Sequence, residues 1–130
     1  MEMKTFQPGF RISARDLGAI ALAVVGAACA PNMPITLGWV ILFVAFHFFL
    51  FCNVFRIARH LELMWAMMFV LLALCGITTG EPGLLALYCA SSMFAVGLIA
   101  WHMRQPSYHG IGWQRINPAL PQWWQDHGRN

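Results

Sequence analysis

One long apolar stretch marks this chain as a membrane protein. It runs from Thr36 to Arg59 (TLGWVILFVAFHFFLFCNVFRIAR), enough to cross a hydrocarbon core of roughly 30 Å at about 1.5 Å per residue. Apolar residues continue to Cys75, and one helix of that length would measure roughly twice the membrane. The chain must therefore reverse, and we expect the turn in the charged cluster between Arg56 and Glu62. Only 10% of the chain is charged, against about 25% in soluble domains.

Four apolar runs predict an all-α fold of four transmembrane helices in an up-down bundle. Ser13 and Asp16 form an S-x-x-D capping box, a helix-start signature, ahead of the first run. Pro82 is expected in the first turn of the last helix, where its missing N–H costs nothing. The expected helices are about 14–30, 36–57, 61–77 and 83–103. Residues 1–103 then form the transmembrane domain, and residues 104–130 form a cytoplasmic interfacial tail.

The first apolar run has an alternative interpretation as a signal peptide. Basic residues precede it, and the segment Ala28–Ala30 resembles a signal-peptidase cleavage site. Pro31 directly follows the would-be cut, which argues against cleavage, so we interpret the run as a transmembrane helix. Its small residues, Gly18 and Gly26 among them, would let another helix approach closely in lipid.

The basic residues predict the orientation. Neither of the two expected outer loops, 31–35 and 78–82, holds a lysine or arginine. With four spans all eight basic residues fall on one face, which the positive-inside rule makes cytoplasmic, together with both termini. We therefore expect a multi-pass protein of a bacterial cytoplasmic membrane. Aromatic residues are expected at both boundaries: Trp39 and Tyr88 outside, Trp65 and Trp101 inside.

His47 is the main candidate for a cofactor site. It is expected near the bilayer midplane among apolar neighbours, where an ionisable group is costly and usually faces protein or a cofactor. One hypothesis is an axial ligand to a haem or a chlorophyll-type macrocycle. The chain has no second histidine at that depth for a bis-histidine haem. The favoured alternative is a histidine that is hydrogen-bonded across a helix interface.

A second candidate is a polar stripe of Asn53, Arg56 and His60, spaced by three and four residues on one expected helix face. It would contact a partner subunit or the headgroups of bound anionic lipids. The alternative is interfacial anchoring with an Arg59–Glu62 ion pair.

The tail is expected to lie at the membrane surface. It holds Trp113, Trp123 and Trp124, several prolines and no helical period. We expect headgroups or a neighbouring protein to order it, and we favour the neighbour because ordering costs on the order of 1 kcal/mol per residue.

Other site chemistries have little support. The cysteines Cys29, Cys52, Cys75 and Cys89 are isolated, so we expect small buried side chains rather than a zinc site, with a disulfide as the minority alternative. Met64, Met67 and Met68 are expected to pack rather than to bind metal. No dense basic block supports nucleic-acid binding, and no nucleophile–base pair or phosphate loop appears.

The sequence therefore leads to three hypotheses. The first is a non-catalytic accessory subunit of a larger, energy-converting membrane complex, bound to other membrane-protein subunits and to lipids. The second is a haem- or chlorophyll-binding protein with His47 as ligand. The third is a small transporter or channel, which the lack of a mid-span acidic residue weakens.

Overall fold

The computed structural model describes residues 6–29 and 35–127. About 75% of these residues are helical, and none of them lies in a strand. The elements are α1 (Ala14–Ala28), α2 (Ile35–Phe49), the π-helix η1 (Leu50–Val54), α3 (Arg59–Thr79), α4 (Leu84–Met103), α5 (Trp113–Ile116) and α6 (Leu120–His127).

Three helices are long and apolar enough to cross a membrane, as expected for a multi-pass membrane protein. They comprise 19 residues in Thr36–Val54, 21 in Arg59–Thr79 and 20 in Leu84–Met103. At about 1.5 Å per residue each matches a hydrocarbon core of roughly 30 Å. Helix α1 has 15 residues and is shorter, about 22 Å.

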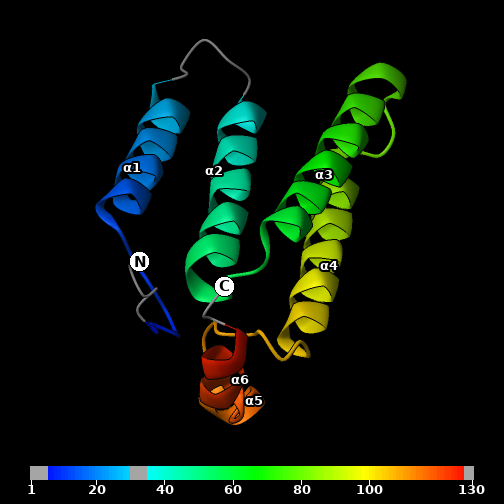
Figure 1. Ribbon diagram of the computed structural model, residues 1–130. Coiled ribbons are helices and arrows are strands. Elements are labelled where there is room, and N and C mark those ends of the chain that lie inside the picture. Colours follow the sequence, from blue (N-terminus) through cyan, green and yellow to red (C-terminus); the bar gives the residue numbers. More distant parts are fainter. Residues whose placement is uncertain (1–5, 30–34, 128–130) are drawn as a thin grey trace.

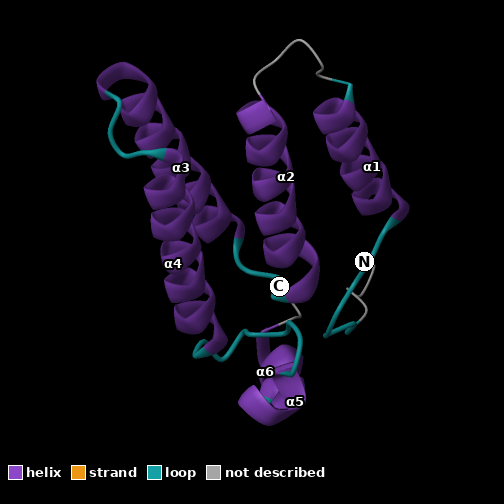
Figure 2. Ribbon diagram, turned by 180° about the vertical axis from the view of Figure 1, so that it is seen from behind, coloured by secondary structure: helices purple, strands orange, loops and turns teal. Residues whose placement is uncertain are grey.

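The helices form two antiparallel pairs. Helix α1 lies beside α2, and α3 lies beside α4, while α5 and α6 lie below one end of α2 and α4 (Figures 1 and 2). The two helices of the first pair come close at Gly38, where an added Cβ would lie 3.3 Å from the carbonyl oxygen of Ala27. Small residues at this crossing therefore permit the close approach of α1 and α2.

A largely aromatic core joins the two pairs. Phe51 of η1 packs with Trp65 and Phe69 of α3, and Leu87 and Leu98 of α4 belong to the same buried cluster. The Trp65 indole Nε1 donates a hydrogen bond of 2.9 Å to the Ser91 carbonyl oxygen of α4. The indole N–H is thus satisfied inside the protein, and the position of Trp65 relative to the membrane boundary stays a prediction.

The second helix ends earlier than residue 57. The π-helical segment closes with the Phe55 N–H bonded to Leu50 and the Ile57 N–H bonded to Phe51, in wider turns than an α-helix makes. Arg56 then takes a left-handed conformation at φ 48°, and α3 starts at Arg59. The reversal therefore occupies four residues, 55–58, without glycine or proline.

The boundaries of the next helices also differ from the prediction. Helix α3 extends to Thr79, because the Thr78 and Thr79 hydroxyls donate to carbonyls one turn back, and Gly80 ends it in a left-handed conformation. Pro82 lies before the N-cap Gly83 and not inside the first turn of α4. The capping box of Ser13 and Asp16 at the start of α1 is confirmed.

The tail contains two short helices. Helices α5 and α6 lie within it, although its sequence shows no helical period. Tyr108 and Leu120 in this region are completely buried. The Tyr108 hydroxyl donates to the Ile111 carbonyl oxygen at 2.8 Å, so its polar end has a partner within the tail.

Candidate functional site

Three distant segments meet at one end of the helices, in a region we call the junction. It comprises the N-terminal segment 6–13, the last two residues of η1 with the reversal 55–58, and the tail 104–127. Backbone N–H groups bridge these segments: Gly9 donates to His109 at 2.7 Å, Arg11 to Asn53 at 3.1 Å, and Ile111 to Val54 at 2.8 Å. The junction therefore ties the two ends of the described chain to the turn between α2 and α3.

Asn53 anchors the N-terminal segment. Its side chain is buried, and with its amide oriented toward acceptors the nitrogen lies 2.7 Å from the Arg11 carbonyl oxygen and 2.9 Å from Asp16 Oδ2. The same Asp16 carboxylate accepts hydrogen bonds from the Ser13 backbone and hydroxyl. Asn53 thus contacts the N-terminal segment of its own chain, and its predicted contact with lipid or a partner stays a prediction.

The expected polar stripe does not form one face. Asn53 is buried in η1, Arg56 lies in the reversal, and His60 is exposed in the first turn of α3. The stripe was predicted for a continuous helix to residue 57, and the earlier end of η1 separates its members. The Arg56 guanidinium instead donates to the Gln7 carbonyl oxygen of the N-terminal segment.

A cavity of about 260 Å³ opens in the junction. Its lining brings together two arginines, a histidine and aromatic groups: Phe6, Gln7, Pro8, Arg11, Arg56, His109 and Trp124. Of the described residues that line it, none is acidic. The cavity is therefore cationic, and it is built from segments almost a whole chain length apart.

The cations in this cavity affect each other's protonation. Burial lowers the pKa of Arg56, and the nearby positive charge of Arg11 lowers it further. Burial also lowers the pKa of His109, and the positive charge of Arg56 lowers it further. A hydrogen bond from the ring to the Ser107 carbonyl oxygen acts in the opposite direction and raises this pKa. His109 is therefore held toward its neutral form while the arginines keep their charge.

The predicted tryptophans lie in the tail near this cavity. The Phe6 ring packs between Trp113 and Trp124, with ring centroids 6.0 Å and 5.6 Å apart. Trp123 stacks on His127 at 4.7 Å. Contacts within the chain therefore hold the tail at the junction, and the predicted neighbouring protein stays a prediction.

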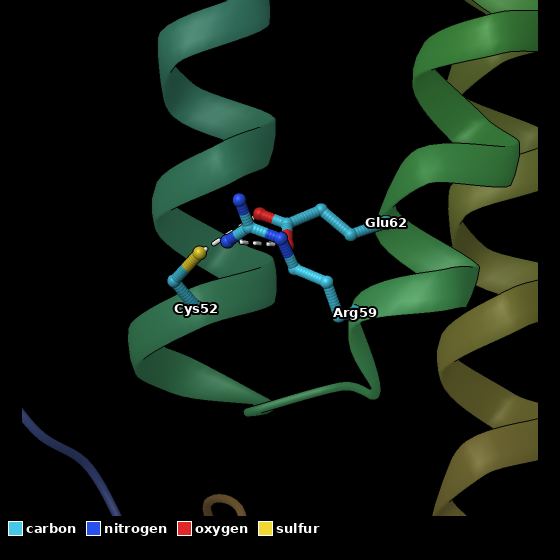
Figure 3. Close-up of polar contacts among 3 residues, drawn as sticks. All are labelled: Cys52, Arg59 and Glu62. Carbon is cyan, nitrogen blue, oxygen red and sulfur yellow. Dashed lines mark hydrogen bonds and ion pairs between the residues drawn. The ribbon is translucent and has the colours of Figure 1, made fainter.

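Glu62 links η1 to the start of α3 (Figure 3). The Cys52 thiol donates to Glu62 Oε1 at 2.9 Å, and Arg59 lies 3.8 Å from Glu62 Oε2, which confirms the expected Arg59–Glu62 pair. The Glu62 carboxylate is buried and the Arg59 side chain is exposed. The four cysteines are free and exposed to the surroundings of the chain, so their predicted burial was wrong.

His47 is buried in the aromatic core. Its ring stacks on Trp65 with centroids 4.8 Å apart and planes 11° apart. Its Nδ1 lies 2.9 Å from the Phe43 carbonyl oxygen, which only accepts, so this nitrogen carries the proton. His47 is only 5% exposed, and aromatic rings of α2 and α3 pack around it. A macrocycle bound to Nε2 would have to enter this packed space. The geometry gives the ligand hypothesis no support, and it stays a prediction.

A second cavity, of about 330 Å³, adjoins the cationic one. Arg56 and His109 line both cavities, and His102 and Cys52 line the second. His102 is buried, and among the described residues its Nε2 has no hydrogen-bond partner.

Within residues 6–29 and 35–127, no three His, Cys, Asp or Glu side chains are placed to hold one metal ion. Comparison of the chain with protein-family models, curated proteins and solved structures finds no match.

Proposed function

We propose that this chain is a non-catalytic accessory subunit of a larger protein complex in a bacterial cytoplasmic membrane. One observation carries the proposal: the helices bury little of their own apolar surface. Within the chain, 17% of the apolar window of Thr36–Val54 is buried, and 22% of the windows of α3 and α4. None of the residues of α1 is buried. The helices thus offer wide faces to other helices.

The proposal treats α1 as a fourth span. The N-terminal segment is bonded to the tail at the junction, whereas α2 begins at the opposite end of the bundle (Figure 1). Helix α1 is the connection between these two ends and lies along α2. Its Leu22 is 75% exposed and its Val25 55%, which favours lipid or protein over water as the surroundings.

The outer face of α1 suits another helix. Gly18 and Gly26 lie there, and a Cβ added at either position would meet nothing within 4 Å. Small residues in membrane helices let backbones approach closely and gain van der Waals contact, which lipid tails do not match as well. The four-span bundle with cytoplasmic termini therefore presents α1 as the docking helix for another subunit.

Site-specific photo-crosslinking tests this proposal. A photoreactive residue in place of Leu22 should capture a different protein chain in native membranes, and native electrophoresis should show the chain in a larger assembly. The same residue in place of Phe51, which is fully buried, should give only internal crosslinks. Migration as a monomer or homo-oligomer, with lipid as the only adduct at position 22, would refute the proposal.

Gly18→Leu provides a matched test of the docking face. The substitution adds bulk where the chain itself has open space, so folding should be unchanged and recovery of the complex reduced. Gly97→Leu on α4, also in open space, is the control.

A further inference from the structure

The cationic cavity lies at the level where lipid headgroups would sit. The span Thr36–Val54 ends, α3 begins and α4 ends at the same side of the bundle, and Arg56 lies between the first two (Figure 1). If these helices cross the membrane, the cavity is at one bilayer boundary. Phosphate groups of phospholipids occupy that depth, so a cationic cavity there faces anionic headgroups.

The arginines of this cavity have spare hydrogen-bonding capacity. Arg56 donates from one guanidinium nitrogen to the Gln7 carbonyl oxygen, and none of the described lining residues supplies a carboxylate. Within the described residues the ion pair found is Arg59–Glu62, which does not include Arg11 or Arg56. Guanidinium groups present several N–H donors in a planar fork that matches phosphate oxygens.

Among the described acids, Asp16 interacts electrostatically with Arg11. Its carboxylate already accepts hydrogen bonds from Ser13 and from the Asn53 amide. The Arg11 side chain is exposed. An anion that entered the cavity would therefore meet two arginines, and Asp16 would weaken its binding without occupying the site.

An apolar groove follows the cationic cavity along α1 and α2. Two cavities, of about 330 Å³ and 210 Å³, lie between these helices and share Ile20, Ala45 and Phe49. The first also includes Asp16 and Asn53, next to the junction, and the second extends to Leu42. The groove and the cationic cavity share no described lining residue, and Asn53, which is bonded to the Arg11 backbone, connects them. From Asn53 the groove continues between α1 and α2.

The length of the groove fits one leaflet. From Asn53 to Leu42 the helix rises about 16 Å, and half of a hydrocarbon core is about 15 Å. The groove is lined almost entirely by apolar side chains beyond Asn53 and Asp16. Its dimensions and polarity correspond to one acyl chain.

We propose that Arg11, Arg56 and the α1–α2 groove form a binding site for one anionic glycerophospholipid, with its phosphate in the cationic cavity and an acyl chain between α1 and α2. Trp124 and His109 form the cavity wall on the side of the tail. The bound lipid would connect the N-terminal segment, the reversal and the tail. This site does not depend on the chain being a subunit of a complex.

Native mass spectrometry of the full chain in detergent tests the headgroup. We expect dioleoyl-phosphatidylglycerol to remain bound and dioleoyl-phosphatidylcholine to be lost, with at least about tenfold preference. Arg11→Gln should reduce phosphatidylglycerol retention about tenfold, because it removes a charge-assisted contact. Arg115→Gln, an exposed arginine of the tail, is the matched control and should retain the lipid.

Arg11→Gln is preferred to Arg56→Gln as the first variant. Among the described residues the Arg11 side chain has no hydrogen-bond partner, whereas Arg56 donates to the Gln7 carbonyl oxygen. Equal retention of both lipids, or an unchanged affinity in Arg11→Gln, would overturn the proposal.

The groove is tested separately from the phosphate. Ala45→Phe fills the space shared by both groove cavities, and we expect it to lower retention of dioleoyl-phosphatidylglycerol several-fold. Ala90→Phe on the exposed face of α4 is the control. Inorganic phosphate distinguishes the source of the anion: it should displace the lipid only weakly. If inorganic phosphate binds as tightly as the lipid and Ala45→Phe has no effect, the site recognises free phosphate and the lipid assignment is wrong.

Discussion

At the scale of single residues, Gly110 shows how closely the tail approaches the reversal. A Cβ at this position would collide with the Phe55 carbonyl oxygen and would lie 2.7 Å from the Tyr108 hydroxyl. Neither neighbour is the free end of a flexible side chain, since one is backbone and the other is bonded to Ile111. The junction therefore requires glycine here.

We predict that Gly110→Ala destabilises the docking of the tail by about 1–3 kcal/mol, the usual cost of overpacking. Trypsin cleavage at Arg104 and Arg115 in detergent measures it, and cleavage should be faster in the variant. Gly97→Ala is the control, since a Cβ there meets nothing within 4 Å and alanine favours a helix. Equal cleavage rates in both variants would show that the tail does not depend on this contact.

The junction also shows which residues sequence reasoning missed. Arg56 was singled out, but Arg11 and His109 were not, because they are separated from it by about 45 and 53 positions. Helical periodicity relates only residues a few positions apart. Gly9 and Gly110 offered the one local signal, as glycines that mark positions where backbones come close.

At the scale of elements, the predictable features were those that bilayer thickness controls. In lipid, a run of about twenty apolar residues satisfies its backbone hydrogen bonds by forming a helix. Helices α2, α3 and α4 therefore lie within a few residues of their expected positions. The ends depend on local hydrogen bonds, such as those of Thr78 and Thr79, and apolarity does not encode them. The tail helices depend on contacts with Phe6 and Val54, which no local pattern reveals.

The tail should dock less firmly in acid. Burial lowers the pKa of His109 below its usual value near 6.5, so the folded junction favours the neutral ring. Arg56 and Arg11 face it from the cavity, and His102 approaches from α4, so a proton on His109 adds repulsion. The unfolded tail binds this proton more readily, so docking is complete above about pH 6.5 and weakens as the pH falls through the folded pKa.

We measure this effect by hydrogen exchange of the Ile111 amide, which is bonded to the Val54 carbonyl oxygen. Trypsin is unsuitable here because its own activity changes with pH. After correction for the intrinsic pH dependence of exchange, protection in lipid-free detergent should decline between pH 7.5 and 5.5. His109→Gln should remove most of that decline. An equal decline in the variant would assign the effect to another group.

At the scale of the whole molecule, the fold is two helix pairs joined in two different ways. An aromatic layer around Trp65 joins them inside the bundle, and the junction joins them at one end. The opposite end has no such link among the described residues: the turn from Thr79 to Gly83 contacts its own pair. Among the described residues, the end contacts that join the two pairs therefore lie at the basic end.

This asymmetry and the charges give a prediction about threading. The basic residues Arg11, Arg56, Arg59, Arg104 and Arg115 lie toward the junction, whereas the far turn holds Glu81. From the positive-inside rule we predict that the junction is cytoplasmic. Single cysteines replacing Ile12, Glu81 or Gln122, in a chain without its native cysteines, report the side of each position through an impermeant maleimide.

In intact cells we expect labelling at position 81 only, and labelling at positions 12 and 122 after the membrane is opened. All three positions are exposed in the folded chain, so a lack of labelling reflects the membrane and not burial. If α1 failed to cross, position 12 would lie on the outer side with the start of α2, and the bond between Gly9 and His109 would have to break. Labelling of position 12 from outside would therefore contradict both the four-span topology and the junction. The hydrogen bond between Gly9 and His109 requires the N-terminal segment and the tail to lie on one side of the membrane.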